Sequence, residues 1–110
     1  MQPEEKIRRL IEEGEVLGDN VRLAVMLFLS IRGKARFTEI AEGLGLSPGR
    51  LAHHLKALEE KDYIRVNRPW EDLRTRVLIL TPDGINALRT FLSKLREAQE
   101  NIKKLADTGF

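Results

Sequence analysis

Two short helical segments separated by a glycine turn lie in the middle of the chain, and they limit the possible fold more than any other feature. The segment 38–43 has apolar residues at helical spacing, and Thr38 is its expected N-terminal cap. A tight turn at Gly45 follows. Ser47 is then expected to cap a second helix, with Pro48 at its first position. Two short helices joined by a glycine-containing turn predict a helix-turn-helix.

The hydrophobic pattern changes directly after the second helix. Residues 63–68 alternate between apolar and polar side chains, and residues 76–80 are apolar and rich in β-branched side chains. A charged loop separates them, which predicts an antiparallel hairpin with a charged tip, the wing of a winged helix-turn-helix. Residues 34–37 could add one short extended pairing.

Three further helices complete the predicted architecture: 3–13, Asp19 to about residue 32, and a helix from the Thr81 cap to about residue 105. We therefore expect a mainly α fold with a small β-hairpin (α+β). A single winged-helix DNA-binding domain spans 1–110, with its core at 19–81.

The last helix carries a seam of residues spaced alternately three and four apart, as in a coiled coil. The seam consists of Ile85, Leu88, Leu92, Leu95, Gln99 and Ile102. It is longer than one small domain needs to bury. The terminal helices 3–13 and 82–105 are therefore predicted to join two copies of the chain into a homodimer.

Composition excludes several classes of protein. The chain is 42% hydrophobic and 33% charged, which is typical of a soluble globular domain, and it has no cysteine for disulfides or thiolate metal sites. No apolar run is long enough to span a membrane, and the start lacks the features of a signal peptide, so we expect a cytoplasmic protein without a membrane partner. The positive charge is concentrated in the middle: residues 32–76 hold ten basic and seven acidic side chains.

Several motifs occur in a fixed order along the chain: Asp19-Asn20-Val21-Arg22-Leu23, His54-Leu55, Leu58-Glu59 and Thr81-Pro82-Asp83-Gly84. In this order they resemble the winged-helix transcriptional regulators of the MarR and ArsR type, in particular the "HL…LE" pattern and the "LTPxG" start of the helix after the wing. The resemblance covers about residues 19–95 and implies a small prokaryotic DNA-binding protein, archaeal ones included.

The resemblance indicates no particular effector. The cysteine metal site of many ArsR proteins has no counterpart here, and the chain is short for a MarR protein, which leaves little room for a ligand pocket. A small-molecule effector therefore stays unknown, and no cofactor is expected.

The second helix of the motif, 47–61, is predicted to lie in the major groove of double-stranded DNA. Its leucines fall on one side of the helical wheel and its basic residues on the other. Arginine can pair with guanine, and a helix start can hold a phosphate. The wing, 67–76, is expected at the minor groove. The predicted DNA-contact residues are Ser47, Pro48, Gly49, Arg50, His53, Lys56, Arg68, Arg74 and Arg76.

The neighbouring histidines invite a metal interpretation, which the geometry disfavours. His53 and His54 point about 100° apart on a helix and have no third ligand, so no metal site is predicted. His54 lies near the apolar face and is expected to be a partly buried hydrogen-bonding residue. No nucleophile–base pair or phosphate loop indicates an enzyme.

The main hypothesis is a homodimeric, sequence-specific transcriptional regulator. Two alternatives stay open: a winged-helix module for protein–protein contact, and an architectural DNA binder with little sequence preference. The basic residues on the second helix favour DNA over protein as the partner.

Overall fold

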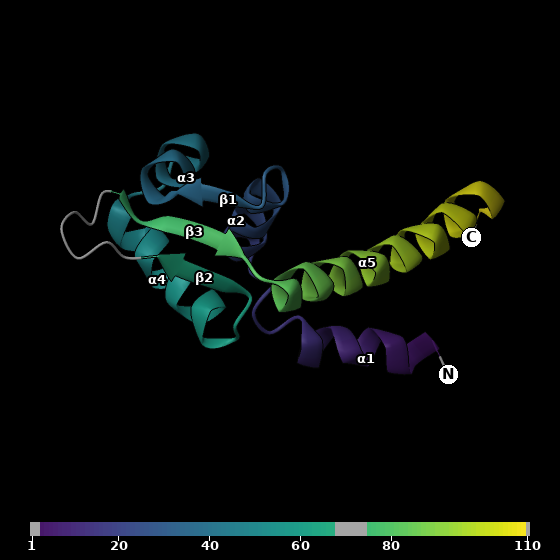
Figure 1. Ribbon diagram of the computed structural model, residues 1–110. Helices are drawn as coiled ribbons and strands as arrows, with labels where there is room; N and C mark the ends of the chain where they lie inside the picture. Colours follow the sequence, from purple (N-terminus) through teal and green to yellow (C-terminus); the bar gives the residue numbers. More distant parts are fainter. Residues whose placement is uncertain (1–2, 68–74, 110) are drawn as a thin grey trace.

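A computed structural model of the chain describes residues 3–67 and 75–109. The elements follow the order α1 (Pro3–Glu13), α2 (Asn20–Ser30), β1 (Lys34–Arg36), α3 (Phe37–Leu44), α4 (Pro48–Glu60), β2 (Ile64–Asn67), β3 (Val77–Leu80) and α5 (Pro82–Thr108). The mainly α fold with a small sheet is the winged helix-turn-helix that the sequence predicts (Figure 1). The hairpin strands and the extra extended segment at 34–36 occur where they are expected.

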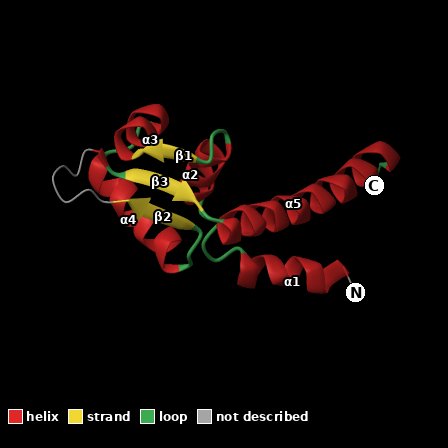
Figure 2. Ribbon diagram, in the orientation of Figure 1, coloured by secondary structure: helices red, strands yellow, loops and turns green. Residues whose placement is uncertain are grey.

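The three strands form one antiparallel sheet in the order β1-β3-β2. Leu78 of β3 is paired with Ala35 on one side and Val66 on the other, and it is fully buried. Helices pack around this small sheet, as Figure 2 shows. The sheet therefore closes the core and holds the base of the wing.

The core is built from buried apolar side chains of α2 to α5, of the sheet and of the connection before α2, and Leu10 of α1 packs against it. Its largest fully buried members are Leu17, Met26, Leu29, Ile40, Leu51, Leu58, Leu78 and Val25. Four of these come from α2 or the connection before it. This explains why α2 is apolar nearly all round: helices and sheet surround most of it.

Local capping fixes the starts of three helices. The Asp19 carboxylate accepts hydrogen bonds from the backbone N–H groups of Val21 and Arg22, at 2.9 and 3.0 Å. Ser47 Oγ accepts from the Arg50 N–H at 3.2 Å, and Thr81 Oγ1 accepts from the Gly84 N–H at 2.9 Å. All three caps are those predicted from the sequence.

The predicted cap at Thr38 is wrong. Helix α3 begins one residue earlier, at Phe37, and its N-terminal cap position is Arg36. The reason is tertiary: β1 leads directly into the helix, the Phe37 N–H donates to the Arg76 carbonyl at 2.9 Å, and the Phe37 ring is buried. The helix also continues to Leu44, past the expected end at residue 43, and Gly45 closes it with a left-handed φ of 66°.

The terminal helices form an arm that projects from the winged-helix core. Helices α1 and α5 contact each other and run away from the sheet together (Figure 1). The radius of gyration is 16.5 Å, whereas about 13 Å is expected for a compact chain of this length. The arm makes the molecule elongated, with extents of 59 × 25 × 22 Å.

A close backbone approach joins α5 to the core. The Thr81 hydroxyl donates to the carbonyl of Asp62 at 2.5 Å, and the Thr81 N–H donates to the carbonyl of Tyr63 at 3.2 Å. Gly84, one turn into α5, lies against the same Tyr63 carbonyl, where a Cβ atom would overlap the oxygen. This junction places the start of α5 at the C-terminal end of α4.

Replacing Gly84 with alanine is expected to lower the free energy of unfolding by about 1–3 kcal/mol, because the added methyl group forces the two backbones apart. Urea denaturation measures the change. Gly49→Ala is the matched control: Gly49 also lies in the first turn of a helix, but a Cβ there meets open space, so a change within about 0.5 kcal/mol is expected. Equal stabilities of the two variants would contradict the tight junction.

Candidate nucleic-acid interface

Helix α4 has a buried apolar face and an exposed basic face. Leu51, Leu55 and Leu58 are 0%, 4% and 0% exposed, as their positions on the helical wheel predict. All six residues predicted on this helix to contact DNA are exposed: Ser47, Pro48, Gly49, Arg50, His53 and Lys56. The leucine contacts fix the rotation of α4 about its axis, and this rotation turns the basic side chains toward solvent.

The exposed face of α4 carries no carboxylate over most of its length. The first acidic residue in the helix is Glu59, near its C-terminal end. Gly49 lies between Pro48 and Arg50 without a side chain, so the first turn is thin enough to approach another surface closely. A phosphate-lined groove could therefore meet this half of α4 without like-charge repulsion.

The wing is only partly within the described residues. Arg68 and Arg74 lie outside them. Arg76 is described, and its guanidinium stacks on the Phe37 ring with 4.1 Å between its central carbon and the ring centroid. This cation–π contact joins the base of the wing to the start of α3, a connection that sequence reasoning missed because the two residues are distant in the chain.

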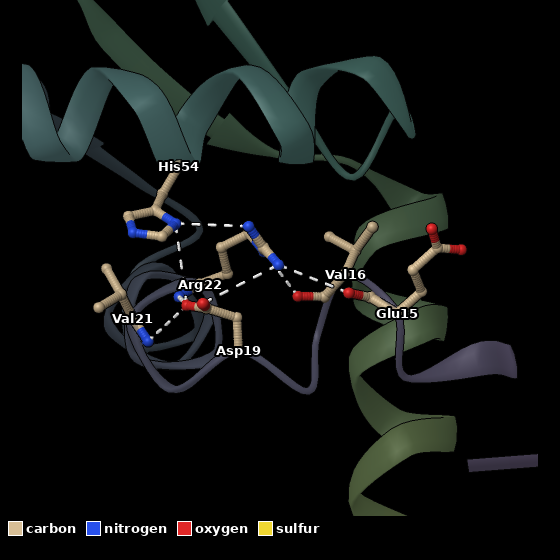
Figure 3. Close-up of polar contacts among 6 residues, drawn as sticks. All are labelled: Glu15, Val16, Asp19, Val21, Arg22 and His54. Carbon is tan, nitrogen blue, oxygen red and sulfur yellow. Dashed lines mark hydrogen bonds and ion pairs between the residues drawn. The ribbon is translucent and has the colours of Figure 1, made fainter. Parts of the chain in front are cut away.

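A network of polar side chains lies behind the basic face (Figure 3). Arg22 of α2 places its Nη1 atom 3.4 Å from His54 Nδ1 of α4. The Asp19 carboxylate lies 3.8 Å from the same ring nitrogen and 3.9 Å from Arg22 Nη2. The His54 side chain is 12% exposed. It is therefore the partly buried hydrogen-bonding residue that the sequence predicts.

The network shifts the pKa values of both titratable members. Burial lowers the pKa of His54 below its ordinary 6.5, and the positive charges of Arg22, His53 and Arg50 act in the same direction, whereas Asp19 opposes them. Burial alone would raise the pKa of Asp19. The Arg22 N–H, the charges of Arg22 and His54 and the Val21 N–H nevertheless hold it below its usual value.

Charge pairing also shapes the start of α3. The Glu39 carboxylate accepts from Arg32 Nη2 at 2.8 Å and from the Arg36 backbone N–H at 3.4 Å. The hydrogen bond from Arg32, followed by the one from the Arg36 backbone, lowers the pKa of Glu39. The Arg36 side chain is also paired with Glu39, with 3.8 Å between Nε and the carboxylate, so two of the basic side chains in the middle of the chain are paired within the protein.

The seam predicted on the last helix divides into two parts. Leu88 is 5% exposed and packs in the core of its own chain, which corrects its assignment to the dimerisation surface. Ile85, Leu92, Leu95 and Ile102 are 36–67% exposed, and Gln99 is also exposed. Leu88 packs in the core because the first turns of α5 lie against the core. The rest of the seam lies along the projecting arm.

The part of the chain that the structure describes contains neither a cluster of metal ligands nor a membrane-spanning helix. Within residues 3–67 and 75–109, no three His, Cys, Asp or Glu side chains lie close enough to hold a metal ion. Over the same ranges, no helix has the length and apolar character needed to cross a membrane.

Comparison with known proteins identifies this architecture. Residues 21–98 match the family model described as a winged helix DNA-binding domain. The chain belongs to this family. This winged-helix protein is accordingly a DNA-binding protein of the transcriptional-regulator class and not an enzyme.

Individual proteins and solved structures are also similar to this chain. An uncharacterized protein of Methanocaldococcus jannaschii is 26% identical over 90 residues, which cover 81% of this chain and 98% of the relative. A transcriptional regulator homologue from Pyrococcus horikoshii OT3 is 31% identical, with a TM-score of 0.82 over 89% of this chain and 97% of that structure. S. aureus MarR, in complex with salicylate and kanamycin, shares the fold at 22% identity, with a TM-score of 0.69 over 94% of this chain and 70% of that structure.

The lowered pKa of His54 predicts a pH-dependent stability of the winged-helix protein. Because the unfolded chain binds a proton at His54 more readily than the folded chain does, the free energy of unfolding should fall as pH drops from about 6.5 through the lowered folded-state pKa. Above about pH 7.5 this effect is absent. Urea denaturation between pH 7.5 and 5.5 measures it.

His54→Gln should remove most of this slope, since the amide does not titrate. His53→Gln, at the exposed neighbouring position, is the matched control and should keep the slope of the parent. If the slope survives in His54→Gln and disappears in His53→Gln, the slope arises from His53 and the prediction is wrong.

Proposed function

We propose that this winged-helix protein is a homodimeric, sequence-specific regulator that inserts α4 into the major groove of double-stranded DNA and lays its wing along the minor groove. The exposed face of α4 is the observation that carries the proposal. It combines a donor suited to guanine (Arg50), a histidine (His53) and a lysine (Lys56), with no carboxylate among them.

Each residue of this face has a distinct proposed role. Arg50 lies in the first turn, where recognition helices approach base edges, and its planar fork can donate two hydrogen bonds to guanine. Lys56 lies six residues later, less than two turns along the helix, and is suited to a phosphate as a point charge. His53 lies between them and can meet either. MepR of S. aureus, which shares the fold at 22% identity (TM-score 0.67, over 92% of this chain and 75% of that structure), was solved in a mutant form bound to an oligodeoxyribonucleotide.

The arginines of the wing support its assignment to the minor groove. Its base strands, β2 and β3, are described, but Arg68 and Arg74 are not. Arg76, which stacks on Phe37, is better suited to holding the wing against α3 than to entering a groove. We therefore assign direct minor-groove contact to Arg68 and Arg74 only.

Arg50→Ala should lower affinity for a selected duplex by about 1–3 kcal/mol and relax the preference at one base pair. Lys56→Ala should weaken binding to selected and random duplexes alike, and reduce the slope of log affinity against log salt by about one unit. Fluorescence anisotropy at several salt concentrations measures both effects.

Lys61→Ala is the matched control, because Lys61 is an exposed lysine directly after α4 and outside the basic face. It should change neither quantity. Parental binding in both Arg50→Ala and Lys56→Ala would support the protein-contact module instead. Equal affinity of the parent for selected and random duplexes would support the architectural binder.

The exposed apolar side chains of the arm support the dimer. Ile7 and Ile11 of α1 are 61% and 76% exposed, and Ile102 and Leu105 of α5 are 67% and 48% exposed. Leu92 and Leu95 are exposed as well, so a single chain leaves many large apolar side chains of the arm open to water, an arrangement that soluble monomers rarely show.

A second copy of the chain is the occupant that fits this surface. A two-fold dimer makes the same patch face itself, so each arm covers the other. Gln99 lies within the apolar seam and can hydrogen-bond its partner's counterpart, which fixes the register. Such a dimer presents two recognition helices, and the operator should contain two half-sites about 10 bp apart, or a multiple of this.

The double substitution Leu92→Glu/Leu95→Glu should convert a dimer into a monomer, because it places four carboxylates in one apolar interface. Light scattering at tens of micromolar chain measures the mass. Ser93→Glu/Asn101→Glu adds the same charge at exposed positions on the other side of α5 and should stay dimeric. A monomeric parent would refute the dimer, and a dimeric Leu92→Glu/Leu95→Glu variant would place the interface elsewhere.

A further inference from the structure

Arg22 is a single cation within the apolar helix α2, and its guanidinium contacts three groups in two segments, the α1–α2 connection and α4 (Figure 3). Its Nε–H donates to the carbonyl of Val16 at 2.8 Å, and Nη2 donates to the carbonyl of Glu15 at 3.5 Å. Its Nη1 lies 3.4 Å from His54 Nδ1. Only 19% of the side chain is exposed. The group is thus held by the protein and is not part of the solvated surface.

The two carbonyls that Arg22 binds belong to the connection between α1 and α2. This connection is anchored in the core, since Val16 and Leu17 are 9% and 1% exposed. It leads directly into the arm, where α1 contacts α5. Through these two hydrogen bonds, the Arg22 guanidinium holds the α1–α2 connection, which is the base of the arm.

The third partner lies on the recognition helix. His54 follows directly after His53 of the exposed basic face, and its side chain points toward Arg22 of α2 (Figure 3). Because a guanidinium can only donate, His54 Nδ1 must accept, which requires the neutral ring with its proton on Nε2. The lowered pKa of His54 agrees with this state.

We propose that Arg22 is the positioning residue that sets the orientation of α4 relative to the α1–α5 arm, and with it the half-site spacing that the dimer accepts. This inference rests on the proposed dimeric DNA-binding function. The C-terminal end of α4 is already tied to α5 through Thr81 and Asp62. The buried leucines fix the rotation of α4 about its axis, and the Arg22–His54 contact adds a polar connection from the middle of α4 to the base of the arm.

Lysine cannot replace this arginine. The guanidinium is planar and presents several N–H groups in fixed directions, whereas an ammonium is a compact point charge that cannot span the same three acceptors. Arg22→Lys therefore keeps the charge and removes the geometry. A residue that serves only stability would lower affinity for every duplex equally, whereas a positioning residue affects the choice among spacings.

The first experiment compares duplexes whose two half-sites differ in separation by single base pairs, together with a duplex that carries one half-site. The parent should prefer one separation. Arg22→Lys should reduce this preference by about tenfold while it binds the single half-site as the parent does. Arg32→Lys, an exposed arginine paired with Glu39, should keep the parental preference. An unchanged preference in Arg22→Lys would overturn the proposal.

Substitutions of His54 also test the Arg22–His54 contact, and they leave the hydrogen bonds from Arg22 to the α1–α2 connection in place. His54→Leu removes the acceptor and should reduce the spacing preference as Arg22→Lys does, whereas His54→Gln supplies an amide oxygen and should restore it. If Arg22→Lys does not fold, these two variants still test the positioning role. Equal behaviour of His54→Leu and His54→Gln would contradict the proposal.

The second experiment needs no DNA and separates failure of the positioning role from failure of the proposed function. The chain has no cysteine, so spin labels can be placed only at Glu60→Cys on α4 and Glu100→Cys on α5, both exposed. Doubly labelled chains are diluted with unlabelled ones. The distance distribution between the labels should broaden or shift with Arg22→Lys and not with Arg32→Lys. An unchanged distribution in Arg22→Lys would refute the positioning role even if the parent binds DNA as proposed.

Discussion

The packing of three leucines beneath α4 is the contact on which the rest of the interface depends. Leu51, Leu55 and Leu58 are at most 4% exposed, and their burial contributes roughly 1.5–3 kcal/mol for each side chain. Because they occupy one side of the helix, they determine its rotation, and this rotation turns the basic residues toward solvent. The proposed DNA-binding surface, with Arg50 and Lys56 exposed on it, is thus a consequence of the core.

Features set by neighbouring residues could be predicted from the sequence, and features set by tertiary contact could not. The caps at Asp19, Ser47 and Thr81 involve hydrogen bonds over two or three residues, so the local pattern contains the information. The start of α3 depends on the pairing of Phe37 with Arg76, which lies far along the chain, and the prediction at Thr38 failed for that reason.

The same distinction applies to the candidate site. The exposed and buried faces of α4 follow from helical periodicity, so the residues of its outer face could be named in advance. The contact between Arg22 and His54 spans 32 positions in the sequence, and no periodicity indicates it. A single arginine in an apolar helix, three residues after a capping aspartate, was the available signal, because a cation at such a place requires buried acceptors. The sequence likewise could not show that Leu88 would be used by the core of its own chain.

In the proposed dimer on DNA, the projecting α5 helix would act as a lever that converts a small angle into a change of register. With 27 residues at about 1.5 Å each, it is about 40 Å long. A tilt of about 5° at its base moves its tip by about 3.5 Å, which is close to the rise of one base pair. A small change of orientation near Thr81 and the α1–α2 connection therefore causes a large displacement of the free end of the arm. A contact of a few ångströms at the base of such a lever can decide which of two neighbouring half-site separations the protein tolerates.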